Sequence, residues 1–253
     1  MKPSHILMAT AAILASGACN AKNGGNAATG DAAESKAIEA VKPPANGDWS
    51  TVTVATSAGG FMMGNPDAKV KLIEIGSLSC PHCKAFDDEG VPTLVDKYVK
   101  SGNVSWEFRP YIIHGPVDMA ANLVVRCNGE KTFFPLMQAL YKDQTTWLAK
   151  VEAAPKDKVA QIQTLPTNQV FVAMAGLLGL QDWAAARGVP AAKSNQCLSD
   201  QKMIDHEVQV VTNVSDQYPD FTGTPAFVIN GKMLPREVVD WETLEPKLRE
   251  ALR

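Results

Sequence analysis

The sequence has no surplus of charge of either sign. Its 24 lysine and arginine residues are nearly balanced by 27 aspartate and glutamate residues, which gives a net charge of −3 with neutral histidines. Nowhere along the chain do lysine and arginine gather into a basic cluster. Because proteins that bind nucleic acids need concentrated positive charge, we expect no nucleic-acid partner.

A hydrophobic run long enough to span a membrane is missing at the N-terminus. The apolar segment there covers only residues 6–15, which is too short to cross a bilayer. It follows Lys2 and His5 and precedes the small residues Ser-Gly-Ala at 16–18. This order is typical of an export signal, so we predict a signal peptide at residues 1–18.

Cysteine is scarce, with five residues in the chain. Cys19 directly follows the predicted signal, in a position that resembles the modified cysteine of a bacterial lipoprotein. Ser16, however, stands where such signals usually carry leucine. Lipidation at Cys19 and ordinary cleavage after Ala18 are therefore alternatives. The other four cysteines lie in the part that we expect to fold, and an even number suits an oxidising compartment.

Residues 19–48 are rich in alanine, glycine, asparagine and lysine and have no hydrophobic period. We interpret them as a flexible tether. The pattern changes at Trp49, after which Val52 and Val54 alternate with threonine and indicate a short edge strand.

The folded part is organised around Cys80-Pro81-His82-Cys83. Residues 70–75 before this motif are apolar on both faces, as in a strand buried in the middle of a sheet. Residues 84–100 after it have a helical pattern, which Gly90 and Pro92 should bend. Pro81 suits a first helical position, which makes Cys80 the N-cap. The positive helix end should then favour the Cys80 thiolate.

The remaining pattern predicts a second strand, a helical block and a return to strands. Residues 104–108 should pair in parallel with 70–75 through the intervening helix. Thr167 is a candidate N-cap within the helical block, and Asn230-Gly231 indicates a hairpin. We expect helices at residues 119–126, 133–142, 156–165, 168–178, 182–187, 202–217 and 241–252, and strands at 226–229 and 232–234.

Four features together resemble the DsbA-like thiol oxidoreductases of the bacterial cell envelope, which have the thioredoxin fold. They are the Cys-Pro-His-Cys motif after a buried strand, Glu74 six residues before Cys80, a helical insert after the second strand, and Thr224-Pro225 before a hairpin. The resemblance covers about residues 50–253. It implies an α/β thioredoxin fold with an inserted all-helical domain, in which residues 49–115 and 201–253 form the thioredoxin-like domain and residues 116–200 form the insert.

The resemblance also implies roles for individual residues. Cys80 would be the attacking and leaving thiol, Cys83 the buried resolving thiol, and Pro225 a cis-proline that faces them. The backbone edge at Thr224 would then be free to pair with an extended substrate. We expect an apparent Cys80 pKa below about 6 that rises when His82 is lost, because an imidazolium at position 82 attracts a thiolate.

Glu74 is a further candidate for catalysis. It shares a strand face with Val70 and Leu72, and burial there would raise its pKa and let it exchange a proton near Cys83. The lysine that accompanies this glutamate in the family is not evident, and Arg109 is a possible substitute. We interpret the acidic residues 87–89 as a solvated helix face.

Cys127 and Cys197 bracket the helical block. A bridge between them would close a loop of about 70 residues and contribute about 4 kcal/mol, and two free buried thiols are the alternative. Neither cysteine has the neighbours that a zinc site needs, so we predict no metal site. His114 and His206 are interpreted as ordinary surface or packing residues.

We therefore predict a monomeric thiol:disulfide oxidoreductase of the periplasm that oxidises exported polypeptides at Cys80/Cys83. It would need no cofactor, only a membrane redox partner that reoxidises the dithiol. A disulfide isomerase or reductase of the same fold is one alternative. A non-catalytic Cu(I) or Zn(II) carrier that binds through the same thiolates is another.

Overall fold

The computed structural model of the protein describes residues 40–44 and 47–253. All of them belong to one compact unit, Ile38–Arg253. The predicted signal at residues 1–18 and the lipidation candidate Cys19 lie outside the described residues, as does most of the predicted tether. Within the described part, no helix is long and apolar enough to cross a membrane.

A mixed sheet forms the centre of the fold, with the strand order β1-β2-β4-β3-β5-β6. β3 pairs in parallel with β4, from Val70 opposite Val104 to Gly76 opposite Pro110, and antiparallel with β5. The predicted central strand and its parallel neighbour are thus confirmed. The strands are β1 (Thr53–Ala55), β2 (Phe61–Gly64), β3 (Val70–Gly76), β4 (Val104–Pro110), β5 (Ala226–Ile229) and β6 (Lys232–Met233).

The connection from β3 to β4 is helical but interrupted, as its glycine and proline predict. α1 (Pro81–Glu89) ends at Gly90, α2 (Val91–Thr93) is one short turn, and η2 (Leu94–Val99) is a π-helix. Pro92 has no N–H for a helical hydrogen bond. A Cβ at Gly90 would lie 2.8 Å from Cε2 of Phe86, so a larger residue at the end of α1 would have to displace the Phe86 ring.

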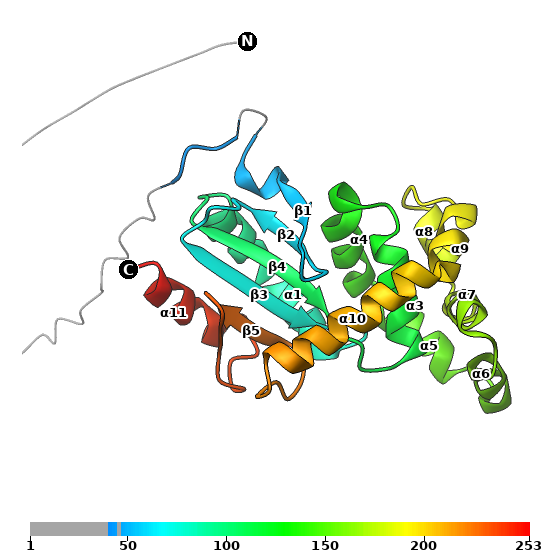
Figure 1. Cartoon of the computed structure of the whole chain (residues 1–253). Coiled ribbons are helices and arrows are strands. Elements are labelled where there is room, and N and C mark those ends of the chain that lie inside the picture. Colours follow the sequence, from blue (N-terminus) through cyan, green and yellow to red (C-terminus); the bar gives the residue numbers. More distant parts are fainter. Residues whose placement is uncertain (1–39, 45–46) are drawn as a thin grey trace, which may run out of the picture. The chain divides into compact units, whose positions relative to one another are not determined.

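Residues 116–200 are helical, and α10 leads from them back to the sheet (Figure 1). The sequence pattern did not predict α5 or α9. Thr167 is the first residue of α7, and the N-cap of this helix is Pro166. Two β-branched threonines weaken the helical signal of α5, but burial of Trp147 holds this helix in place. The helices are α3 (Pro116–Arg126), α4 (Glu130–Lys142), α5 (Gln144–Glu152), α6 (Lys156–Gln163), α7 (Thr167–Leu178), α8 (Leu180–Ala185), α9 (Ala191–Ser199), α10 (Gln201–Gln217) and, after the hairpin, α11 (Trp241–Ala251).

The helical block and the sheet share one hydrophobic core. Phe133 and Phe134 of α4 carry much of this contact: the Phe133 ring stacks on Phe61 of β2 at 4.0 Å, and the Phe134 ring lies 4.8 Å from Trp106 of β4. The insert is therefore packed directly against β2 and β4, and β4 is the parallel neighbour of β3, the strand that leads to Cys80. The domain boundaries given above stay a prediction.

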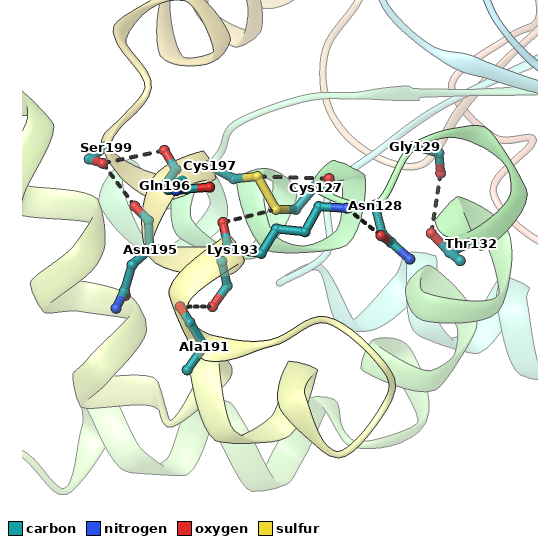
Figure 2. The surroundings of a disulfide bond; sticks show 11 residues. Cys127, Asn128, Gly129, Thr132, Ala191, Lys193, Asn195, Gln196, Cys197 and Ser199 are labelled. Carbon is teal, nitrogen blue, oxygen red and sulfur yellow. Dashed lines mark hydrogen bonds between the residues drawn. A yellow bond between two sulfur atoms is a disulfide. The ribbon is translucent and has the colours of Figure 1, made fainter.

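A disulfide joins the C-terminal end of α3 to α9 (Figure 2). It links Cys127 and Cys197, whose Cα atoms lie 5.7 Å apart across a sequence separation of 70 residues. Lys193 of α9 donates a hydrogen bond to Asn128 at 2.5 Å beside the bridge. The two ends of the helical block are thus covalently held together.

Removal of this bridge should lower stability without touching the dithiol. We expect the Cys127→Ala/Cys197→Ala variant to lose up to about 4 kcal/mol of unfolding free energy, because the unfolded chain regains the freedom of a long loop. Denaturant unfolding should be compared in a Cys80→Ala/Cys83→Ala background, so that the second cysteine pair does not contribute. A loss below about 0.5 kcal/mol would contradict the expectation.

Candidate active site

Cys80 lies where the chain leaves β3 and enters α1. It is the N-cap of α1 in extended conformation, and Pro81 occupies the first helical turn, as its sequence position predicts. The backbone N–H groups of His82 and Cys83 donate hydrogen bonds to the Cys80 sulfur. The side chain is only 4% exposed. The Cys80 sulfur therefore sits in the ring of free donors at a helix N-terminus.

The loop before β5 closes the other side of the Cys80 sulfur. The Thr224–Pro225 peptide bond is cis, and the Thr224 carbonyl oxygen lies 3.3 Å from the Cys80 Sγ atom. Figure 1 shows β5 next to β3, the strand that leads to Cys80. The structure thus places Cys80 next to the Thr224–Pro225 loop. In the sequence, only the family resemblance links these two segments.

The environment lowers the pKa of Cys80 from 9.0 to about 5. The largest cause is a hydrogen bond from the Cys83 side chain; burial opposes it, and the side chain of Thr224 and the two backbone N–H groups add to the lowering. The His82 ring is exposed, and within residues 47–253 no hydrogen bond joins it to Cys80. The contact that His82 makes with the sulfur therefore comes from its backbone, and the catalytic role of its ring stays a prediction.

Cys83 has the opposite environment. It is completely buried, and burial raises its pKa well above the ordinary value of 9.0, helped by its hydrogen bond to Cys80 and by the nearby Glu74. The pKa values of the two thiols in the motif are thus shifted in opposite directions. Cys80 is the group that ionises, and Cys83 keeps its proton.

Glu74 lies on β3 in the buried layer behind the dithiol. It is 1% exposed, and its Oε2 atom accepts a hydrogen bond from Trp106 Nε1 at 3.1 Å. Burial, followed by the charge of Asp87, raises the pKa of Glu74 well above 4.5. The expected burial and its effect are therefore found, and burial favours the protonated form of the carboxyl group.

Arg109 is not the partner of Glu74. Glu74 pairs in register with Phe108, so the next residue along β4 points to the opposite face of the sheet. There Arg109 donates from Nε to Glu107 Oε1 at 3.1 Å and from Nη1 to Gln217 Oε1 at 3.0 Å. The proposed substitution of arginine for the family's lysine is wrong.

Asp87 also differs from expectation, because it is buried rather than solvated. Burial raises its pKa to about 7, the charge of Asp88 adds to this, and its Oδ1 atom has no hydrogen-bond partner among the described residues. The helical period gave the signal that was missed: Cys83 and Asp87 are four residues apart and face the core together. Asp88 and Glu89 are exposed as predicted.

The loop from Ser77 to Cys80 is anchored by the helical block. Asp118 of α3 accepts hydrogen bonds from the Ser79 N–H at 3.0 Å and from Ser77 Oγ at 2.9 Å. Nδ1 of His114 lies 2.6 Å from Ser79 Oγ. His114 is exposed, yet through this bond it supports the loop next to Cys80.

No group of three histidine, cysteine, aspartate or glutamate side chains is arranged to hold a metal ion among residues 40–44 and 47–253. His206, on α10, lines a cavity of about 410 Å³ with Arg126 and Lys202, away from the Cys80 motif. Burial lowers the pKa of His206.

A dithiol at the start of the helix after a central strand, opposite a cis-proline, defines the thioredoxin class. A family model described as Thioredoxin matches residues 56–248, and the chain belongs to this family. A curated relative from Rickettsia bellii, named "Putative protein-disulfide oxidoreductase", is 28% identical over 181 residues, which are 71% of this chain and 60% of the relative. The chain thus spans only about 60% of the length of such relatives.

Solved structures extend the comparison. A protein-disulfide isomerase from Novosphingobium aromaticivorans superimposes with a TM-score of 0.72 at 28% identity, over 76% of this chain and 96% of that protein. The α-DsbA1 protein of Wolbachia pipientis gives a TM-score of 0.58 at 19% identity, over 83% and 93% of the two chains. The second similarity shows the shared fold, which includes the DsbA-like arrangement expected from the sequence.

The thiolate can be titrated directly by its ultraviolet absorbance in the reduced protein. We expect an apparent Cys80 pKa of about 5. Cys83→Ala should raise it most, because this variant removes the largest stabilising hydrogen bond, and His82→Ala should raise it less, because the backbone N–H remains. An unperturbed value near 9 in the wild type would contradict the site as described, and Cys80→Ala is the control for assignment.

Asp87 should make stability depend on pH. The pKa of Asp87 is about 7 in the folded protein and lies above its ordinary value of 3.8. The stability associated with its protonated form is therefore fully present below pH 3.8 and is lost as the pH rises through 7. We expect Asp87→Asn to stabilise the protein by on the order of 3 kcal/mol at alkaline pH and to have little effect at acidic pH. Denaturant unfolding across this range tests it, with exposed Asp88→Asn as the matched control; parallel curves for Asp87→Asn and wild type would contradict it.

Proposed function

We propose that this protein is a thiol:disulfide oxidoreductase that introduces disulfides into exported polypeptides. The observation that carries the proposal is the placement of the two thiols. Cys80 is the N-cap of α1 beside Thr224, where its thiolate is stabilised, and Cys83 is completely buried, where the protonated form is favoured. A stable thiolate favours the reduced form of the pair, by about 1.4 kcal/mol or 30 mV for each pKa unit below ambient pH. The oxidised pair is then a strong disulfide donor.

The reaction would proceed in two exchanges. A substrate thiolate attacks the Cys80 sulfur of the Cys80–Cys83 disulfide, forms a mixed disulfide with Cys80, and releases Cys83, which takes up a proton. A second substrate thiolate then attacks the substrate sulfur of the mixed disulfide and releases Cys80 as a thiolate. The substrate loses two electrons to the cysteine pair, and the low pKa of Cys80 makes it a good leaving group.

The reaction also needs a proton for Cys83 and a place where the substrate chain binds. Glu74 is buried behind Cys83, where burial favours its protonated form, and it is the proposed source of the proton that Cys83 takes up when it leaves. The backbone at Thr224, beside the Cys80 sulfur, is the proposed edge on which an extended substrate pairs. Pro81, which follows Cys80 directly, keeps the helix start in place for both exchanges.

The partners and location follow from the same proposal. Reduced or unfolded exported polypeptides would be the substrates, and a membrane redox partner would reoxidise the dithiol. The predicted signal supports a place in the bacterial cell envelope, as a monomer in the periplasm or anchored through a lipid on Cys19. The name of the Rickettsia relatives supports the reaction class.

A disulfide isomerase is the second candidate, because a protein of that name has the same fold at 28% identity. An isomerase acts on wrongly paired disulfides and starts from the reduced pair, whereas an oxidase starts from the oxidised pair. The redox state in which the protein is active therefore separates the two.

Refolding assays test the proposal. The oxidised protein should form disulfides in a reduced, unfolded substrate, and Cys80→Ala and Cys83→Ala should both be inactive because neither can form the Cys80–Cys83 disulfide. With a disulfide-bonded substrate, Cys83→Ala should accumulate the mixed disulfide at Cys80, because no Cys83 thiol remains to resolve it. Activity confined to the reduced protein acting on a scrambled substrate would support the isomerase instead. The solution mass from size exclusion with light scattering tests the expected monomer.

A further inference from the structure

Three backbone carbonyls of the loop before α1 accept hydrogen bonds from the helical block. The hydroxyl of Tyr141 donates to the Ser77 carbonyl at 3.1 Å. The side-chain amide of Gln144 donates from Nε2 to the Leu78 carbonyl at 2.9 Å and to the Cys80 carbonyl at 3.0 Å. Gln144 is therefore bonded to the very residue whose sulfur reacts.

Gln144 is itself fixed in place. It is the first residue of α5 and only 2% exposed. The preceding residue, Asp143, accepts hydrogen bonds at its Oδ2 atom from Trp183 Nε1 and Arg187 Nη2, both at 2.8 Å. The start of α5 is thus tied to α8, and the amide of Gln144 is presented to the Cys80 loop from a rigid support.

The position of this amide has two physical consequences. First, it holds the Cys80 carbonyl, which also accepts the first helical hydrogen bond of α1 from the Lys84 N–H at 3.1 Å. This keeps the N-cap in the conformation in which the His82 and Cys83 N–H groups meet the sulfur. Second, the positive end of the amide dipole lies beside Cys80 in a buried layer, where low dielectric strengthens its effect on a charge.

We propose that Gln144 is a positioning residue for the redox pair, which sets how strongly the Cys80 thiolate is favoured although it touches no sulfur. The proposal rests on the proposed function, because it makes the helical block part of the redox site. It assigns to the insert a role in tuning the reaction.

Two substitutions of different charge test it. Gln144→Leu removes the donor, and Gln144→Glu replaces it with an acceptor that adds negative charge when ionised. We expect thiolate titration to give a Cys80 pKa that rises by at least half a unit in Gln144→Leu and further in Gln144→Glu. The equilibrium with glutathione should shift by about threefold or more toward the oxidised pair, since half a pKa unit corresponds to about a threefold change.

A matched control is available in the same helical block. Gln181 of α8 donates from Nε2 to the Val172 carbonyl at 3.3 Å and to Asn195 at 2.9 Å, away from the dithiol. Gln181→Leu should leave the Cys80 pKa and the glutathione equilibrium unchanged. Circular dichroism establishes that each variant is folded, and Gln144→Met replaces Gln144→Leu should the latter fail to fold.

An unchanged Cys80 pKa in folded Gln144→Leu and Gln144→Glu would overturn the proposal and leave Gln144 a purely structural residue. The titration does not depend on activity. If the wild type failed to oxidise substrates while the pKa order Gln, Leu, Glu held, the proposed function would fail and the role of Gln144 in setting the thiolate would stand.

Discussion

The negative charge on one sulfur atom is the constraint on which the rest of this structure depends. Cys80 ionises because its sulfur lies at the start of α1 and receives hydrogen bonds from Cys83 and from two backbone N–H groups. These donors exist only because the chain changes from strand to helix at this residue. The central sheet, the loop at Pro225 and the helical block all contact the short segment that makes this change.

The buried layer behind the dithiol favours the protonated, uncharged form of the groups in it. Glu74, Asp87, Cys83 and Tyr141 are all buried there, and burial raises the pKa of each. Groups that share such a layer repel each other when charged, so their ionisation is coupled. Negative charge is therefore favoured on the sulfur that has donors around it and disfavoured on the buried groups behind it. The selectivity between two cysteines three residues apart comes from this contrast between a polar helix end and an apolar interior.

The sequence was most informative where local signals and long-range structure agree. The apolar residues on both faces of 70–75 identify a central strand, and Pro81 identifies the helix start, so the position of Cys80 could be predicted from a few neighbours. Arg109 and Asp87 could not be placed in the same way. The side of the sheet that Arg109 faces depends on the register of β4 with β3, and the burial of Asp87 depends on what packs against α1.

Gln144 also could not be identified from the sequence. Its helix carries a weak local signal, and its bonds to Leu78 and Cys80 join segments more than 60 residues apart. No motif connects them in the sequence. Contacts of this kind arise only when the helical block packs on the sheet, so they could be found only in three dimensions.

The bridge between Cys127 and Cys197 means that the protein must itself acquire a disulfide in order to mature. Its two cysteines lie on different helices, so a newly made copy must be oxidised before α3 and α9 are covalently joined. If the protein makes disulfides in other chains, each new copy is also a client for that chemistry. The first molecules would then depend on an external oxidant, and later ones could be matured by their predecessors.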